Sequence, residues 1–229
     1  MKLKSEVNLN DEVNQTAEAS ENANLNAQDV TTSDKIEDLH DEQLQKFGKT
    51  VRSQTETYRL QEGDHGGNSV FFNLNGKDFR YSLDDGVNGS MYLAYAPDTA
   101  MKEVFQNKKG LRESDLDRYV MGIVAIEKDI HVLDVGRLVK GGQLTLNDVT
   151  TSTRAVTQKL AKKVHSAGFD GMEFPSNVTG DPCLVVWHNV PDGTGMATTK
   201  SQTILSDFKY QDKEAADILV DDLGIPVEP

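Results

Sequence analysis

Short apolar runs recur from about residue 55 onward and predict a chain rich in β-strands. Residues 55–61 alternate between polar and apolar positions, which is typical of a half-buried strand. Residues 69–74 and 77–82 flank Asn75-Gly76, a strong signal for a hairpin turn. Further strands are predicted over residues 90–96, 119–126, 130–135, 172–174, 183–188 and 201–209.

Apolar positions at helical spacing predict four helices between these strands. The first covers residues 33–47, with Ser33 as its N-cap and Gly48 as its end. The second opens at Pro97 and runs to about Asn107. The third and fourth are predicted over residues 150–167 and 213–223. Strands with interspersed helices place the chain in the α+β class.

Negative charge is concentrated at the two ends of the 229-residue chain. The formal net charge is -13, from 24 Lys and Arg against 37 Asp and Glu. Most of the excess lies before residue 48 and after residue 206, so the stretch between them is close to neutral. We therefore expect no binding to nucleic acid, because phosphate backbones select for excess Lys and Arg. Residues 1–32 contain no aromatic residue, Gly or Pro, and we expect them to be disordered. The predicted organisation is an acidic extension over residues 1–48 and a folded domain over residues 49–229.

Several classes of protein are disfavoured by composition. No apolar run approaches the ~18 residues of a membrane span, and the first residues do not form a Sec-type signal peptide. One cysteine, Cys183, excludes an internal disulfide and a cysteine-rich zinc site. The five histidines lack metal-ligand spacing, so we expect no metal. We expect the protein to act in a cytoplasm.

Candidate chemistry rests on polar residues within the predicted elements. Arg59 and Arg80 each lie inside a strand pattern, where they either face solvent or hold a phosphate with their planar guanidinium. Glu103 falls beside the apolar stripe of the helix that opens at Pro97. Tyr92 is in a strand and Ser176 follows one. Taken one at a time, each of these residues also suits an ordinary structural role.

Taken together, four segments form a recognisable series. They are TYRL at 57–60, FRYS at 79–82, MYLAYAPDTAMKEVF at 91–105, and GFDGMEFPS at 168–176 followed by CLVVWH at 183–188. In this order the series resembles the RES domain, a family named for its Arg, Glu and Ser positions. The resemblance covers roughly residues 55–190.

The resemblance implies a fold and an activity. The family fold is similar to that of ADP-ribosyltransferases, with a split β core around a nicotinamide cleft. Its members consume NAD+ by hydrolysis or phosphorolysis, and ADP-ribosyl transfer is also described for the family. They commonly form bacterial toxin–antitoxin pairs. The expected partners are thus NAD+ as substrate, phosphate as an acceptor, and a neutralising antitoxin or immunity protein, with no further cofactor.

The same resemblance assigns roles to individual residues. Glu103, Arg59 and Arg80 become the catalytic candidates, and Tyr92 and Ser176 the substrate-binding candidates. The chain departs from the family in having Phe79 where a glycine usually precedes the second arginine, and in a long stretch between Glu103 and Ser176.

Alternatives remain open at this point. The same cleft would suit ADP-ribosyl transfer to a macromolecule, and Phe79 would suit a degenerate cleft in a non-catalytic binding module. The residues also do not distinguish a toxin–antitoxin pair from an injected effector, or water from phosphate as acceptor.

Overall fold

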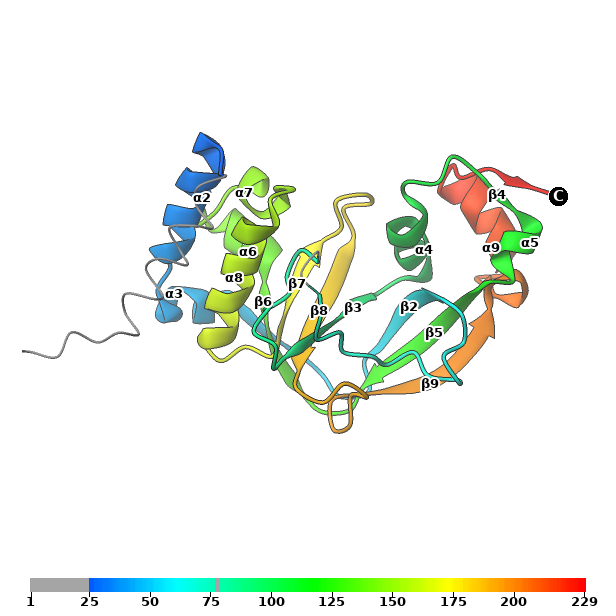
Figure 1. Ribbon diagram of the computed structural model, residues 1–229, viewed down its shortest axis with the longest axis horizontal. Helices are drawn as coiled ribbons and strands as arrows, with labels where there is room; N and C mark the ends of the chain where they lie inside the picture. The colour runs from blue at the N-terminus through cyan, green and yellow to red at the C-terminus, as the bar shows by residue number, and fades with distance from the viewer. Residues whose placement is uncertain (1–24, 77–78) are drawn as a thin grey trace, which may run out of the picture.

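A curved eight-stranded sheet forms the centre of the computed structural model, which describes residues 25–76 and 79–229 (Figure 1). Its strand order is β1-β6-β7-β8-β3-β2-β5-β9. Neighbouring strands are antiparallel, except for the parallel pair β6 and β7. The strands are β1 Gly48–Val51, β2 Glu56–Glu62, β3 Gly89–Ala94, β5 Tyr119–Ile126, β6 Ile130–Asp134, β7 Gly171–Pro175, β8 Pro182–His188 and β9 Ala197–Ile204.

The sheet is split between β2 and β3. These strands meet where Tyr58 lies opposite Ala94, whereas β2 pairs with β5 and β3 pairs with β8 along their whole lengths. Two half-sheets therefore diverge from one point, β1-β6-β7-β8-β3 on one side and β2-β5-β9 on the other. This confirms the expected α+β class with a split β core.

The helices gather in two groups on one side of the sheet (Figure 1). One group covers the half-sheet that ends in β1, and it comprises α2 Ala27–Glu37, α3 Asp41–Lys46, α6 Val135–Lys140, α7 Leu146–Thr150 and α8 Arg154–Ser166. The other lies over the opposite half, and it comprises α4 Pro97–Phe105, α5 Glu113–Leu116, the 3-10 turn Leu205–Asp207, α9 Ala215–Asp217 and the π-helical turn Ile218–Asp222. Short pairs complete the chain: β10 Lys209–Tyr210 with β11 Lys213–Glu214, and β12 Val227–Glu228 with β4 Leu111–Arg112.

Both faces of the sheet carry a hydrophobic core. The larger core lies between the sheet and the helices, where Met101, Phe105, Leu133 and Leu160 are fully buried. The smaller core lies on the other face and includes Phe72, Met91, Val124, Val132 and Leu184. Loops cover that second face, because the Phe72 N–H donates to the carbonyl of Pro191 (2.8 Å) and Met196 belongs to the same core. Near-continuous burial along β5 and β8 follows from this double coverage.

The predicted hairpin at Asn75-Gly76 is wrong. Residues 69–72 instead lie across β5, where Gly122 has no side chain and a Cβ would collide with Ser69. Asn73 then pairs with Ser90 rather than with the segment after the turn. Tertiary contacts with β3 and β5 outweigh the local turn signal. Residues 77 and 78 lie outside the described residues.

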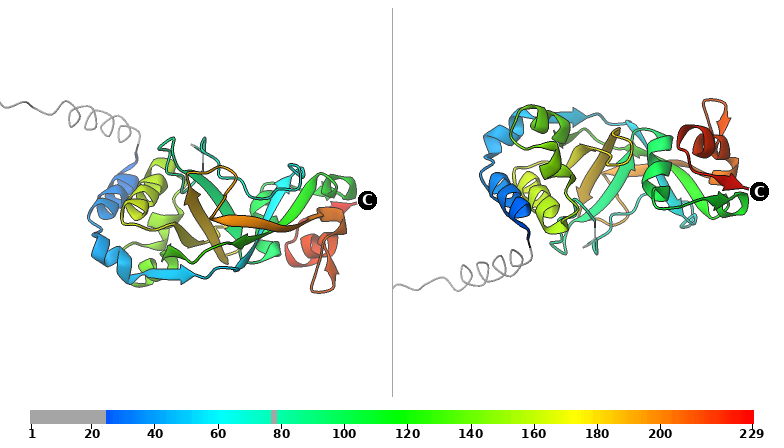
Figure 2. Two further views of the ribbon diagram at one scale, coloured as in Figure 1. Left: turned by 90° about the horizontal axis from the view of Figure 1, so that it is seen from below. Right: turned by 90° about the horizontal axis from the view of Figure 1, so that it is seen from above.

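The predicted helix 33–47 is also wrong in its extent. Helix α2 begins at Ala27 with Asn26 as its N-cap, and a break separates it from α3. Ser33, predicted as the cap, is buried within α2 and accepts a hydrogen bond from Lys159 of α8 (3.0 Å). Residues 27–32 are thus helical, contrary to the disorder expected for residues 1–32; residues 1–24 of that expectation lie outside the described part of the chain. Figure 2 shows α2 beside α8 from two further directions.

Other predictions differ from the structure mainly at their boundaries. The helix predicted over 150–167 is α8 and starts at Arg154, and the strand predicted over 201–209 is β9 and starts at Ala197. Among the described helices, none combines the length and apolar character needed to cross a membrane.

Candidate active site

A cavity of about 530 Å³ lies where the two half-sheets diverge. Strands β2, β3 and β8, helix α4 and the segment around Phe79 contribute to its walls. The volume is within the range of small-molecule sites. Four of the five residues singled out in the sequence line it, namely Arg59, Arg80, Tyr92 and Glu103. The fold therefore brings together residues that are up to 44 positions apart, from Arg59 to Glu103.

Arg80 is half-buried and provides a positive charge with two buried, unused donors. Its Nε and Nη2 atoms are inaccessible to solvent and have no hydrogen-bond partner among the residues that the structure describes. The guanidinium carbon lies 5.3 Å from the centre of the Tyr81 ring, which offers a cation–π contact. Arg80 is in a turn, not in the predicted strand. Because buried N–H groups are nearly always paired, these donors indicate a site for an acceptor that binds from the cavity.

Arg59 both holds a neighbouring loop and lines the cavity. Its Nη1 donates to the carbonyls of Ser69 (2.8 Å) and Phe71 (3.3 Å), which ties the loop across β5 to β2. Burial lowers the pKa of its guanidinium from the usual value, yet arginine stays protonated at physiological pH. One edge of the guanidinium thus supports the cavity wall, and the residue also lines the cavity.

Glu103 contributes a carboxylate to the cavity wall from helix α4. It lies on α4, which packs against β2 and β3, and its neighbour Met101 anchors that helix in the core. Its side chain makes no hydrogen bond or ion pair to the described residues. Glu103, Arg80 and Cys183 all line the cavity, and the Glu103 charge raises the pKa of the Cys183 thiol while the Arg80 charge lowers it, both less than burial raises it.

Aromatic rings form the rest of the wall around Tyr92. The Tyr92 ring lies 5.6 Å from Phe79 and 6.3 Å from Phe174, measured between centroids. Its hydroxyl accepts a hydrogen bond from the N–H of Tyr81 (2.8 Å), which holds the segment that carries Arg80. Burial raises the pKa of the Tyr92 phenol to about 12, so it is neutral at physiological pH. Phe79 is 47% exposed and Phe71 is 53% exposed, and both line the cavity.

Ser176 is not among the residues that line this cavity. It is buried, and its Oγ accepts the N–H groups of Val178 and Thr179 (both 3.1 Å), which is a serine turn. Its contact with a substrate stays a prediction. Its neighbour Asn177 does line the cavity, and so does Arg154, the first residue of α8. The sequence pattern gave no sign of a site at Arg154, because it placed this residue inside the predicted helix 150–167.

The buried thiol of Cys183 lines the cavity, and its reactivity tests whether solvent reaches this part of the wall. Burial is the main reason that the pKa of its thiol is raised, to about 12. The thiolate fraction near pH 8 is then on the order of 10⁻⁴, and thiolate is the reactive species. We expect a thiol-labelling disulfide reagent to leave the folded protein unmodified for hours and to label one thiol at once in guanidinium chloride. Rapid labelling of the folded protein would show that this strand is accessible.

The arrangement suits an anionic ligand with a planar ring. Guanidinium groups bind phosphate oxygens, exposed aromatic faces stack on rings, and a carboxylate stabilises positive charge that develops nearby. Within residues 25–76 and 79–229, no three His, Cys, Asp or Glu side chains gather in a group that would hold a metal ion.

Comparison with known families decides the assignment. A family model described as the RES domain matches residues 56–207, more than half of the chain. The chain belongs to the RES domain family. The matched range contains all five site residues assigned from the resemblance, Arg59, Arg80, Tyr92, Glu103 and Ser176.

A solved structure shares the fold of this RES domain protein. It is a chain of the crystal structure of the M. tuberculosis MbcT–MbcA toxin–antitoxin complex, with a TM-score of 0.53 and 16% sequence identity. The similarity covers 71% of this chain and 90% of that chain. A comparison with curated proteins found no match.

Proposed function

We propose that this RES domain protein is a toxin-like enzyme that cleaves the bond between nicotinamide and ribose in NAD+. The observation that carries the proposal is the unpartnered buried edge of Arg80, which faces a cavity that also holds Glu103 and two exposed aromatic rings. NAD+ combines a pyrophosphate, planar rings and a positive charge on its nicotinamide ring, and so matches each feature. Membership of the RES family supports the same activity.

Each residue has a proposed part in the reaction. Arg59 and Arg80 hold the pyrophosphate, and the ring of Tyr92 supports the nicotinamide end beside Phe79. The glycosidic bond breaks with its electron pair moving to the nicotinamide nitrogen, which leaves neutral nicotinamide and positive charge on the ribose. Glu103 stabilises that oxocarbenium-like charge. Water or phosphate then bonds to the ribose carbon, and attack by water releases one proton to solvent.

The biological setting follows from the same family. We propose that NAD+ depletion in the bacterial cytoplasm is the toxic effect and that an antitoxin or immunity protein neutralises it. The structural neighbour comes from a toxin–antitoxin complex, which favours that setting.

Product analysis tests the proposal and separates the acceptors. Purified protein is incubated with NAD+ labelled in its adenylate phosphate, alone, with added phosphate, and with bacterial extract. Label in free ADP-ribose indicates hydrolysis, and label in its phosphate ester indicates phosphorolysis. Label on protein or RNA would instead establish ADP-ribosyl transfer, and intact NAD+ under all three conditions would favour the binding-module alternative.

A further inference from the structure

The third arginine of the cavity comes from the helical group and not from the split sheet. Arg154 lines the cavity as the first residue of α8, and its side chain is exposed. Its charge acts on the phenols of both Tyr81 and Tyr92 and lowers their pKa values, against the larger effect of burial. Arg154 and Tyr92 line the same cavity.

Asp29 of α2 holds the segment that leads into Arg154. The Asp29 side chain is buried and accepts the hydroxyls of Thr151 (3.0 Å) and Thr153 (2.7 Å). Thr153 is the N-cap residue of α8, but its side chain does not cap that helix. The hydroxyl that would ordinarily fix the first turn of α8 is instead bound to α2. The start of α8 is thus positioned from outside the matched family range.

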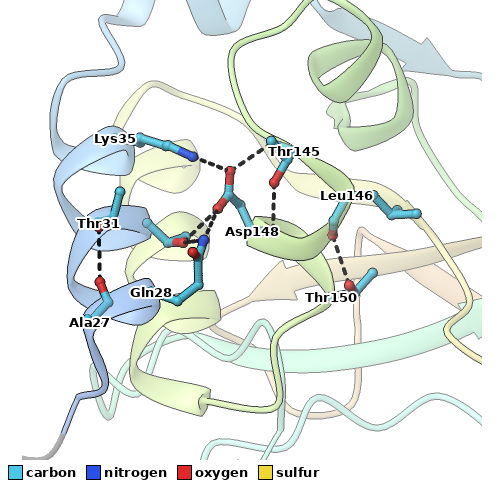
Figure 3. Close-up of polar contacts among 9 residues, drawn as sticks. Ala27, Gln28, Thr31, Lys35, Thr145, Leu146, Asp148 and Thr150 are labelled. Atoms are coloured by element: carbon cyan, nitrogen blue, oxygen red, sulfur yellow. Dashed lines mark hydrogen bonds and ion pairs between the residues drawn. The ribbon is translucent and has the colours of Figure 1, made fainter.

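A second buried carboxylate fixes α2 against α7 (Figure 3). Asp148 accepts hydrogen bonds from Thr32 (2.7 Å) and Gln28 (3.3 Å). It also forms an ion pair with Lys35 (2.9 Å). These bonds lower its pKa, although burial opposes them. The segment from Asp148 to Thr153, which directly precedes Arg154, is therefore bonded to α2 at both ends. Polar bonds of this kind are directional, so they set the position of the segment more narrowly than apolar packing would.

We propose that Arg154 binds the diphosphate of the substrate and that Asp29 is its positioning residue. This inference rests on the proposed function, since it names a further contact for the same substrate. A guanidinium at the rim adds a charge-assisted bond to a phosphate that Arg80 holds from within. Helix α2 then contributes to substrate binding without touching the substrate.

The test measures binding of inorganic pyrophosphate to the full-length chain by calorimetry at constant ionic strength. Arg154→Gln should weaken binding roughly tenfold, as expected for loss of one charge-assisted bond. Asp29→Asn and Thr153→Val disrupt the same hydrogen bond, between the Thr153 hydroxyl and the Asp29 carboxylate, from either partner. Each should weaken pyrophosphate binding several-fold. Combining Asp29→Asn with Arg154→Gln should weaken binding no further than Arg154→Gln does alone, because both changes act through one guanidinium.

Glu37→Gln is the matched control. Glu37 ends the same helix and pairs with Lys159 of α8 (2.6 Å), away from residues 151–154. This variant removes an exposed contact between α2 and α8 and should leave pyrophosphate binding unchanged. With NAD+, Asp29→Asn should raise KM and keep kcat within about twofold, whereas a merely structural loss would reduce the active fraction and hence kcat.

Each outcome decides the inference. Absence of pyrophosphate binding by the unmodified protein, or equal affinity in Arg154→Gln, overturns the role of Arg154. Equal effects of Asp29→Asn and Glu37→Gln overturn the positioning role. If the predicted binding pattern holds but NAD+ is not cleaved, the proposed function fails and the anion site stands.

Discussion

Glu103→Gln should greatly slow nicotinamide release from NAD+ while leaving the fold intact. The substitution keeps the shape of the side chain and removes its charge, so the developing positive charge on ribose loses its stabilising partner. Loss of one preorganised electrostatic contact of this kind reduces kcat by about 10²–10³-fold. The fold should persist, because the Glu103 carboxylate holds no hydrogen bond to the described residues. The measurement is kcat for nicotinamide release, with the melting temperature as a check on folding.

Two comparisons make this result specific. Glu113→Gln, at an exposed position of α5, changes the net charge equally and should leave kcat unchanged. Because the Glu103 charge also raises the pKa of Cys183, Glu103→Gln should lower that pKa and speed labelling of the thiol at alkaline pH. Faster labelling with unchanged kcat would confirm the position of Glu103 and contradict its catalytic role.

Arg80→Met should weaken ligand binding strongly and at the same time stabilise the protein. Two guanidinium nitrogens are buried without partners among the described residues, and burying such donors costs about 1–3 kcal/mol. Part of that cost is offset by the contact with the Tyr81 ring, worth about 0.5–1 kcal/mol. A net gain of about 1 kcal/mol corresponds to a rise of roughly 2–4 °C in melting temperature for a domain of this size. Affinity for NAD+ should fall by about 100-fold, because a bidentate charge-assisted contact is lost.

Arg52→Met is the control for this trade-off between stability and binding. Arg52 is exposed and pairs with Asp129 at the surface (2.7 Å). Its replacement should change neither the affinity nor the melting temperature appreciably, since exposed ion pairs contribute little. A lower melting temperature for Arg80→Met would mean that Arg80 serves the fold rather than a ligand.

The sequence predicted the strands of the core well, because their signal is local. Tyr119–Ile126 is apolar throughout and forms β5 with the predicted bounds, and β2 and α4 follow their patterns closely. The wrong hairpin shows the limit of that reasoning. Asn75-Gly76 is a valid turn signal, but the space above Gly122 decides where residues 69–72 lie, and no local pattern records it.

In the candidate site, too, the sequence did not reveal residues whose positions depend on long-range contacts. The resemblance selected Arg59, Arg80, Tyr92 and Glu103, and the fold brings these four to one cavity. It gave no indication of Arg154 or of Asp29, because their positions depend on contacts between segments more than 110 residues apart. Tyr92 was selected as a substrate-binding residue without a choice between its ring and its hydroxyl; in the fold the hydroxyl accepts the Tyr81 N–H, and the residue lines the cavity.

Nicotinamide release from NAD+ by the purified protein tests the central claim most directly. The time course is followed by chromatography in a phosphate-free buffer and again with phosphate added. We predict multiple turnovers with equal loss of NAD+ and gain of nicotinamide in at least one of the two buffers, and phosphate dependence would identify the acceptor. NAD+ that stays intact in both buffers, while calorimetry shows that it binds, would contradict the proposed cleavage and leave a binding site built on the same fold.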